Sequence, residues 1–326
     1  MINERFIVTG ARRNNRPFSM KDLSECYQAG IYEIDFAGKS ITRQYLEKEP
    51  NREIYTKSYS LSFRSGSLKD DTLYTCTHSE IINFDLMTFK VIDRFSHPLF
   101  NDVHHVNKIG GRLYFADTGI DHMGVIEPDG KLKIQPVSDS NTIENPNFEI
   151  DYRRVSTKPH KIHPNHVSFI NDKIWVTRFN EKDAICLNDP SRKIDISCGK
   201  PHDGLLKDER IHFTTVNGMI VVFDCQSLKC LACYNIPALY NGPNPGWCRG
   251  LEIVGHHAYI GFSSFRWTLS LENLGFLAKN VASLGKKLNP DLPARIIKYD
   301  MKREEIVGEM RFDNKEIDLI FSILKY

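Results

Sequence analysis

The sequence lacks the features that mark membrane-spanning, secreted and nucleic-acid-binding proteins. Its 326 residues contain no apolar run of 18 residues, and the first residues contain no apolar signal segment. The formal net charge is only +2, and no stripe of basic and aromatic residues occurs. We therefore expect neither nucleic acid nor a membrane as a partner, and we expect a cytoplasmic protein with reduced thiols.

Familiar catalytic and metal motifs are absent too. The chain contains no P-loop, no nucleophile-elbow motif and no nucleotide-type glycine run, and its eight cysteines form no pair of CxxC motifs. An isolated CxxC, from Cys230 to Cys233, lies in alternating surroundings typical of an outer strand, so we interpret both cysteines as packing or surface residues. Any site must therefore be assembled from residues that are distant in the sequence.

A short polar knot that opens an apolar strand recurs at intervals of about 40 to 60 residues. A tight turn and a second strand follow each knot. A period of this size, built from short strands and tight turns, is typical of a β-propeller, and the knots would begin the innermost strand of each blade. The four knots lie at 102–106, 163–167, 201–205 and 247–251.

Turn signals between alternating apolar runs divide the chain into blades. Five blades follow one another, the first of them with its inner strand at 61–65. Three strands near the N-terminus lack an inner partner, and segment 316–325 lacks a blade, so joining them closes a sixth blade without open edges. We predict an all-β, six-bladed propeller that forms a single domain over 1–326. Seven blades are the alternative, because 138–162 is long enough to contain further strands.

Three insertions, at 11–29, 138–162 and 268–293, are expected to cover one face of the propeller. They join second to third strands or lead into the next inner strand, and both connections lie on the face where the knots open. Loops this long are typical of lids and binding loops. Apolar residues at helical spacing predict an amphipathic helix in 268–293. It would pack on the rim, act as a lid or form a dimer contact, so we expect a monomer or a homodimer formed through 268–293.

Equivalent positions in the blades can be found by counting nine residues back from one position of each second strand. In the third blade this position is Tyr114, and the other blades have an equivalent residue. In successive blades this count gives Ser65, His105, His166, Asp203 and Gly250. Equivalent positions should form a ring around the channel. Two imidazoles and a carboxylate in one ring, with His202 beside them, predict a divalent transition metal, iron or zinc, held by His105, His166 and His202. A metal-free acid–base cluster and purely structural histidines are the alternatives.

Other acidic residues and histidines near the ring are expected to assist the metal ligands. Asp203, or Asp318 at the same level of the closing strand, would ligate the metal or act as a base. Strand alternation would direct His104 and His163 away from the axis, where they would orient the ring histidines. The histidine pair at 256–257 lies in a turn on the opposite face and is left out of the site.

Arginines are expected to gather at the same mouth of the channel. Guanidinium groups suit carboxylate, sulfate or phosphate, and Trp267 would add an apolar wall. We predict that a small anionic molecule binds there, with Arg249 counted among the catalytic residues. The alternative for each arginine is pairing with a neighbouring acid. The candidate substrate-binding arginines are Arg12, Arg64, Arg178 and Arg266.

The knots at 102–106, 163–167 and 201–205 resemble the blade openings of the six-bladed propeller superfamily. That superfamily contains the gluconolactonase/senescence-marker, strictosidine-synthase and NHL-repeat proteins, and streptogramin lyases have similar blades in a seven-bladed ring. The resemblance implies a metal or a catalytic histidine at the channel mouth. The histidine-rich ring departs from the oxygen ligands of gluconolactonases, which argues against lactonase chemistry.

Together these features predict a metal-dependent enzyme that acts on a small anionic substrate at the channel mouth. Hydrolase, lyase and oxygenase (oxidoreductase) chemistry all fit such a site. The alternative is a non-catalytic propeller that binds a protein or peptide at the same face.

Overall fold

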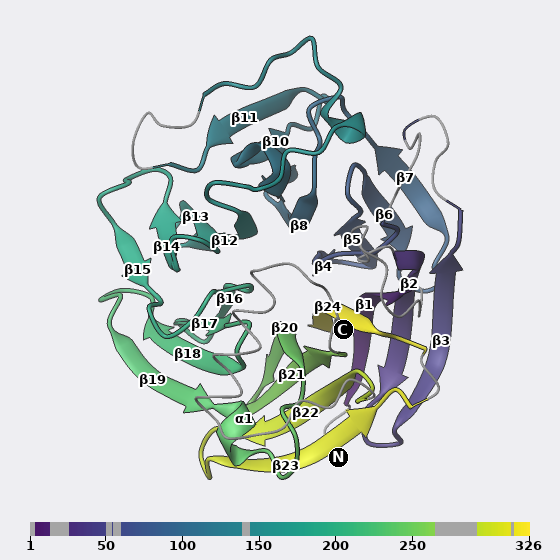
Figure 1. Cartoon of the computed structure of the whole chain (residues 1–326), viewed down its shortest axis with the longest axis vertical. Helices are drawn as coiled ribbons and strands as arrows, with labels where there is room; N and C mark the ends of the chain where they lie inside the picture. Colours follow the sequence, from purple (N-terminus) through teal and green to yellow (C-terminus); the bar gives the residue numbers. More distant parts are fainter. Residues whose placement is uncertain are drawn as a thin grey trace.

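The computed structural model describes residues 4–13, 26–49, 54, 60–138, 144–264, 292–313 and 316–326. The strands of this part of the chain form six antiparallel sheets of four strands each. Figure 1 shows them arranged as blades around a central axis. The prediction of an all-β, six-bladed propeller is confirmed.

The strands of each blade run from the channel to the rim. Blade 1 contains β24 (Leu319–Lys325), β1 (Arg5–Arg13), β2 (Cys26–Asp35) and β3 (Ser40–Glu47). Blade 2 contains β4 (Ser67–Lys69), β5 (Thr72–Cys76), β6 (Ile81–Asp85) and β7 (Val91–Phe95). Blade 3 contains β8 (Val103–Ile109), β9 (Arg112–Asp117), β10 (His122–Ile126) and β11 (Leu132–Pro136).

The other three blades follow in chain order. Blade 4 contains β12 (Pro164–Ile170), β13 (Lys173–Arg178), β14 (Asp183–Cys186) and β15 (Lys193–Asp195). Blade 5 contains β16 (Leu205–Lys207), β17 (Arg210–Thr214), β18 (Met219–Asp224) and β19 (Cys230–Asn235). Blade 6 contains β20 (Trp247–Val254), β21 (His257–Ser263), β22 (Arg295–Asp300) and β23 (Glu305–Arg311).

The two ends of the chain close the ring, as predicted. Strand β1 pairs with β2 on one side and with β24 on the other, and Ile7 lies opposite Leu324. The inner strand of blade 1 therefore comes from the C-terminal end of the chain, while its other strands come from the N-terminal end. This pairing leaves no blade without an inner strand.

The core lies between the blades, because both faces of each sheet are covered by a neighbour. In β1, Phe6 and Val8 pack toward blade 6, whereas Ile7 between them packs toward blade 2. This is the period-two alternation of a strand with both faces buried. Trp175 and Phe213 similarly share a cluster between blades 4 and 5.

The structure corrects one predicted strand and decides between six and seven blades. Segment 61–65 is not a strand, because its amides bond to different blades: Leu61 N donates to Cys26 O of blade 1, and Arg64 N donates to Cys76 O of blade 2. Segment 144–162 contains a short 3-10 helix, Tyr152–Arg154, and no strand, which is why the propeller has six blades and not seven.

A short helix and the insertions complete the fold. Helix α1 (Ile236–Leu239), which the sequence did not predict, begins where the Asn235 side chain accepts from Ala238 N at 3.1 Å. The helix predicted in 268–293 lies almost wholly in the undescribed stretch 265–291, so it stays a prediction. No helix within the described ranges is long and apolar enough to cross a membrane.

Candidate functional site

Bulges in the inner strands place the polar knots. In β8, Val103 pairs with Asp117 and His105 pairs with Ala116, so His104 is an extra residue without an opposite partner. The inner strand β12 is bulged at the equivalent place, between Pro164 and His166. A bulge interrupts alternation and redirects side chains, so the alternation on which the expected direction of His104 rested does not hold at this residue.

The positions found by counting nine residues back lie next to one another around the channel. The rings of His105 and His166 stack with centroids 3.7 Å apart and an angle of 23°. The Asp203 carboxylate accepts from the Thr214 hydroxyl and, at 3.2 Å, from Gly250 N. Ser65 Oγ donates to Phe321 O at 2.8 Å.

The first-blade member of this ring is Ser322, and the placement of Asp318 at this level was wrong. Ser322 pairs with Thr9, and the Cα of Ser322 lies beside Gly250. Asp318 lies four residues earlier, before β24 begins, and its Oδ2 accepts from Arg13 N at 2.9 Å. The level of Asp318 could not be counted from the sequence, because β24 is not joined to β1 by a hairpin.

Burial controls the protonation of the ring residues. It lowers the pKa of His166 to about 3 and the pKa of His105 well below its usual range. Burial also raises the pKa of Asp203 to about 6, against the opposing effect of the bonds from Thr214 and Gly250. The channel therefore contains neutral imidazoles and a carboxyl group that titrates near neutral pH.

The ring histidines do not fit a shared metal ion as they lie. Lone pairs of an imidazole lie in the ring plane, and the planes of stacked His105 and His166 are nearly parallel. The His202 ring lies 5.3 Å from that of Phe179, and the ligand atoms of His105, His166 and His202 do not all lie within 4.8 Å of one another. Metal binding by His105, His166 and His202 thus stays a prediction from the sequence.

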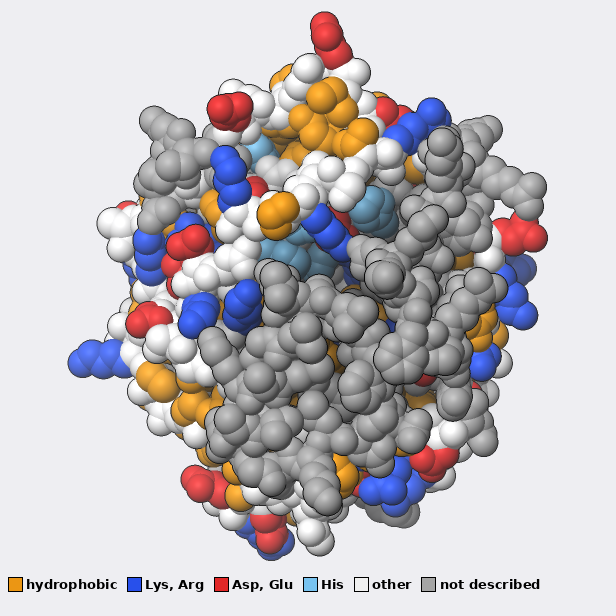
Figure 2. All heavy atoms as spheres, in the orientation of Figure 1, with side chains coloured by type: hydrophobic (Ala, Val, Ile, Leu, Met, Phe, Trp, Pro, Cys, Tyr) orange, Lys and Arg blue, Asp and Glu red, His pale blue; other side chains and the backbone are white. Residues whose placement is uncertain are grey.

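A second group of polar side chains lies at the mouth above this ring. Asp102 Oδ1 pairs with Arg64 at 2.6 Å, and Asp102 Oδ2 lies 3.9 Å from His160 Nε2. His160 Nδ1 lies 3.2 Å from His163 Nδ1, and the His163 ring lies 5.0 Å from the ring of His104. Figure 2 shows histidine side chains gathered in a hollow near the middle of this face, beside lysine and arginine side chains.

Asp121 holds the segment that carries His160 and His163. Its carboxylate accepts from three consecutive backbone amides, those of Lys161, Ile162 and His163, at 2.7 to 3.1 Å. Asp121 lies in the connection between β9 and β10, which confirms that this connection and the start of β12 share one face. A buried carboxylate that binds three amides fixes the loop backbone firmly.

The contacts at the mouth select a set of histidine tautomers. Burial lowers the pKa of His160, and it lowers the pKa of His163 to about 3, so both rings are neutral. Burial opposes ionisation of Asp102, yet Arg64 holds its pKa well below the usual range, so Asp102 is charged. Of the two facing Nδ1 atoms of His160 and His163, one donates and the other accepts, and the charge of Asp102, which is 3.9 Å from His160 Nε2 and not hydrogen-bonded to it, favours the tautomer in which His163 donates. His163 Nε2 then carries a free lone pair.

Two arginines border these histidines. Arg64 NH1 lies 2.8 Å from His104 Nδ1, and the Arg249 guanidinium lies 5.2 Å from the ring centroid of Phe321. Burial first, and then Arg64, lowers the pKa of His104 well below its usual range, and Arg249 acts in the same direction. The mouth thus combines two guanidinium groups, neutral imidazoles and one paired carboxylate.

Of the other predicted substrate-binding residues, the structure describes two, Arg178 and Arg12. Arg178 is fully buried and donates to both carboxylate oxygens of Asp183, at 2.7 and 2.6 Å. Arg12 lies near the end of β1, with its guanidinium 5.8 Å from the ring centroid of Tyr27. Arg266 and Trp267 lie outside the described residues.

Sequence reasoning missed His78 and His160. His78 follows β5, and its Nδ1 lies 3.4 Å from Asp102 Oδ1. His160 lies within an insertion, where no blade register applies. The sequence did contain a pattern that points to the second group of polar side chains. Asp102 and His163 each lie three residues before a histidine of the ring. Both have left-handed backbones, with φ of 56° and 61°. Aspartate and histidine are among the residues enriched in that conformation.

No family model matches the chain, and no curated protein sequence matches it. A solved nidogen/laminin complex is similar in structure, with 8% identity and a TM-score of 0.56 over 98% of this chain and 97% of that one. The propeller domain of Cps50 (Swd1) from Myceliophteria thermophila shows 9% identity and a TM-score of 0.51 over 94% and 89%. Virginiamycin B lyase from Staphylococcus aureus shows 14% identity and a TM-score of 0.47 over 76% and 70%. The first two similarities confirm the propeller fold alone.

Proposed function

We propose that this protein is an enzyme that transfers a proton on a small anionic substrate bound at the channel mouth. His163 would act as the general base, and Arg249 and Arg64 would bind the anionic group. The observation that carries the proposal is the group of neighbouring side chains Asp102, His160 and His163 beside two arginines, with the two histidines 3.2 Å apart at their Nδ1 atoms.

Each residue of this group has one role. Asp102 and His160 are positioning residues, because they fix the tautomer that leaves His163 Nε2 free to accept a proton. A base oriented by a second group, itself oriented by a third, recurs in enzymes on unrelated folds. Either a C–H beside a carboxylate or a water molecule could supply the proton, which corresponds to lyase or hydrolase chemistry.

Substrate binding would also adjust the basicity of His163. A unit charge about 4 Å away is worth about 4 kcal/mol at an effective dielectric constant of about 20, or about three pKa units. An anion at the mouth would thus raise the pKa of His163 from about 3, because it stabilises the charged imidazolium. The base would become competent when the substrate is present.

The proposal involves no step through a metal. If iron or zinc binds at His105, His166 and His202, it would act as a Lewis acid below the mouth, after a rotation that ends the ring stacking. Elemental analysis of protein purified without a histidine tag tests this separately. Near-stoichiometric metal that is lost in His105→Ala and His166→Ala would support the original metal prediction.

The test of function is a thermal-shift screen of small carboxylates, phosphates and sulfates, followed by NMR of each bound compound in D₂O. A general base exchanges a substrate C–H for deuterium, and we expect His163→Gln to abolish exchange or turnover while binding persists. Arg249→Lys keeps the charge but loses the bidentate geometry, so affinity should fall by about 1–3 kcal/mol. Arg112→Lys, at an exposed arginine paired with Glu127, is the control. Binding of a macromolecule and of no small anion would favour a non-catalytic binding module.

A further inference from the structure

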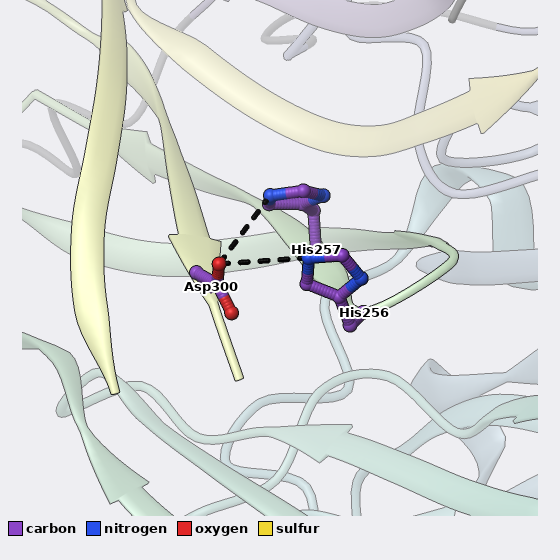
Figure 3. Close-up of side chains that lie close together, drawn as sticks. All are labelled: His256, His257 and Asp300. Atoms are coloured by element: carbon purple, nitrogen blue, oxygen red, sulfur yellow. Dashed lines mark ion pairs between the residues drawn. The ribbon is translucent and has the colours of Figure 1, made fainter. Parts of the chain in front are cut away.

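A separate histidine–aspartate cluster lies in blade 6, at the turn between its inner strand and its second strand. His256 lies in this turn, His257 begins β21, and Asp300 ends the neighbouring strand β22. His257 and Asp300 are directly paired across the two strands. Figure 3 shows both imidazoles and the carboxylate directed toward one another. The turn joins the first two strands of a blade, so it lies on the face opposite the mouth.

The two carboxylate oxygens of Asp300 have different neighbours. Its Oδ1 accepts from Lys302 N at 2.9 Å and from Arg303 N at 3.1 Å, which fixes the side chain against the following turn. Its Oδ2 lies 3.5 Å from His256 Nε2 and 3.7 Å from His257 Nε2. One oxygen therefore faces two imidazole nitrogens, and neither distance is a hydrogen bond.

These distances match the spacing of ligands around a metal ion. Zinc lies about 2.0–2.2 Å from imidazole nitrogen and carboxylate oxygen, so two ligand atoms at a tetrahedral site lie about 3.3 Å apart. All three candidate atoms lie within 4.8 Å of one another, and no other group of three or more in the described part of the chain meets this condition. The two contacts of Asp300 Oδ2, at 3.5 and 3.7 Å, come near this spacing, and the two imidazoles would move closer together around the ion.

Simple ion pairing explains the cluster less well. Neither His256 nor His257 lies within hydrogen-bond distance of Asp300 Oδ2, and His257 lies among other charged groups. The groups that face it include the cation Lys298, which pairs with Glu4, and Asp300 itself. A neutral imidazole could turn an Nε2–H toward the carboxylate, but separations of 3.5 and 3.7 Å are long for such a bond, whereas a cation between the three atoms would contact all of them. Arg303 Nε lies 3.9 Å from Oδ2, but this side chain is 74% exposed and is not held over the cluster.

We propose that His256, His257 and Asp300 bind one divalent transition-metal ion of the zinc class. Two imidazoles and a carboxylate form a donor set typical of such ions, whereas calcium and magnesium prefer oxygen alone. The side chains of His256 and His257 are 42% and 17% exposed, so the remaining coordination positions face solvent. The ion would tie the inner hairpin of blade 6 to its third strand.

The test is a titration of untagged, chelator-treated protein with Co²⁺, followed by visible absorption, and then displacement by Zn²⁺. We expect one Co²⁺ per chain with an absorption spectrum typical of nitrogen and oxygen ligands. The variants His256→Ala and His257→Ala should each weaken binding by at least about 10- to 100-fold, since even the loss of groups outside the ligand set costs this much. Asp300→Asn should act similarly, with its thermal midpoint measured because Asp300 also holds a turn.

Two controls separate this site from the mouth. The His105→Ala/His166→Ala double variant should keep the Co²⁺ spectrum, and so should His97→Ala, at a part-buried histidine in blade 2. Failure of wild-type protein to bind Co²⁺, or unchanged binding in the His256→Ala/His257→Ala double variant, would overturn the proposal. Neither result would affect the function proposed for the mouth.

Discussion

At the residue scale, the same side-chain type has opposite roles in different parts of the molecule. Arg64 and Arg249 border the histidines at the mouth, whereas Arg178 is enclosed between β13 and β14 and paired with Asp183. Buried charges are tolerated when both partners are present and well bonded. The structure therefore supports a stability role for Arg178.

Arg178→Met should destabilise the protein by about 3–5 kcal/mol, because it leaves the buried Asp183 carboxylate without its partner. Chemical denaturation measures this loss of unfolding free energy. Arg112→Met, at a half-exposed ion pair with Glu127, should cost less than about 1 kcal/mol. Equal costs for the two variants would contradict the structural role.

The low pKa of His166 predicts a pH dependence of stability. Its folded-state pKa is about 3, below the ordinary value of 6.5, so between these values the unfolded chain binds a proton that the folded protein does not. The stabilisation is fully present above pH 6.5, and it falls by up to about 1.4 kcal/mol per pH unit as the pH decreases toward 3. The His166→Asn variant lacks this contribution. The stability difference between wild type and variant should therefore shrink from pH 7 to pH 5, and a constant difference would refute the assignment.

At the scale of elements, the site depends on bulges in two inner strands and on the loop that the Asp121 carboxylate holds. The bulges in β8 and β12 place histidines at two levels of the channel, and Asp121 fixes the loop before β12. The blade repeat located His105, His166 and Asp203 correctly, because each inner strand is followed by a hairpin of constant length. It could not locate His160, which lies in an insertion, or foresee that a bulge would bring His104 to the mouth.

Asp121→Ala should loosen the loop that carries the proposed base. Three amides lose a charged acceptor, so hydrogen exchange at Lys161, Ile162 and His163 should accelerate by about 10-fold or more. Exchange measured by NMR or mass spectrometry checks this. Asp129→Ala, at an exposed turn in blade 3, should leave these amides unchanged. Unaltered exchange in Asp121→Ala would mean that other contacts hold the loop.

At the scale of the whole molecule, closure by both chain ends makes stability cooperative around the ring. The sequence predicted this closure because blade 1 lacked an inner strand and segment 316–325 lacked a blade. The insertion at 268–293, with its predicted helix, has no such constraint from the repeat, so periodicity could say nothing about its packing. The fold and its closure were thus predictable from the repeat. The side-chain contacts at the mouth were not, because they depend on a bulge and on an insertion that the repeat does not specify.

Deleting residues 316–326 should abolish cooperative folding, because β1 loses its β24 partner and the core between blades 6 and 1 is opened. Thermal unfolding followed by circular dichroism measures the effect. Deleting Tyr326 alone leaves every β24 pair in place and is the control. A soluble truncated protein with an unchanged thermal midpoint would rule out a structural role for the closure.

The central claim is that an anion binds at the mouth beside neutral histidines and raises the pKa of His163. Calorimetric titration with sulfate at pH 6, in two buffers of different ionisation enthalpy, tests it most directly. If sulfate raises the pKa of His163 from about 3, binding should be accompanied by proton uptake, and the uptake should increase as the pH is lowered. Uptake should vanish in His163→Gln, and affinity should fall in Arg249→Lys. Absence of sulfate binding, or binding with no proton uptake, would contradict the account.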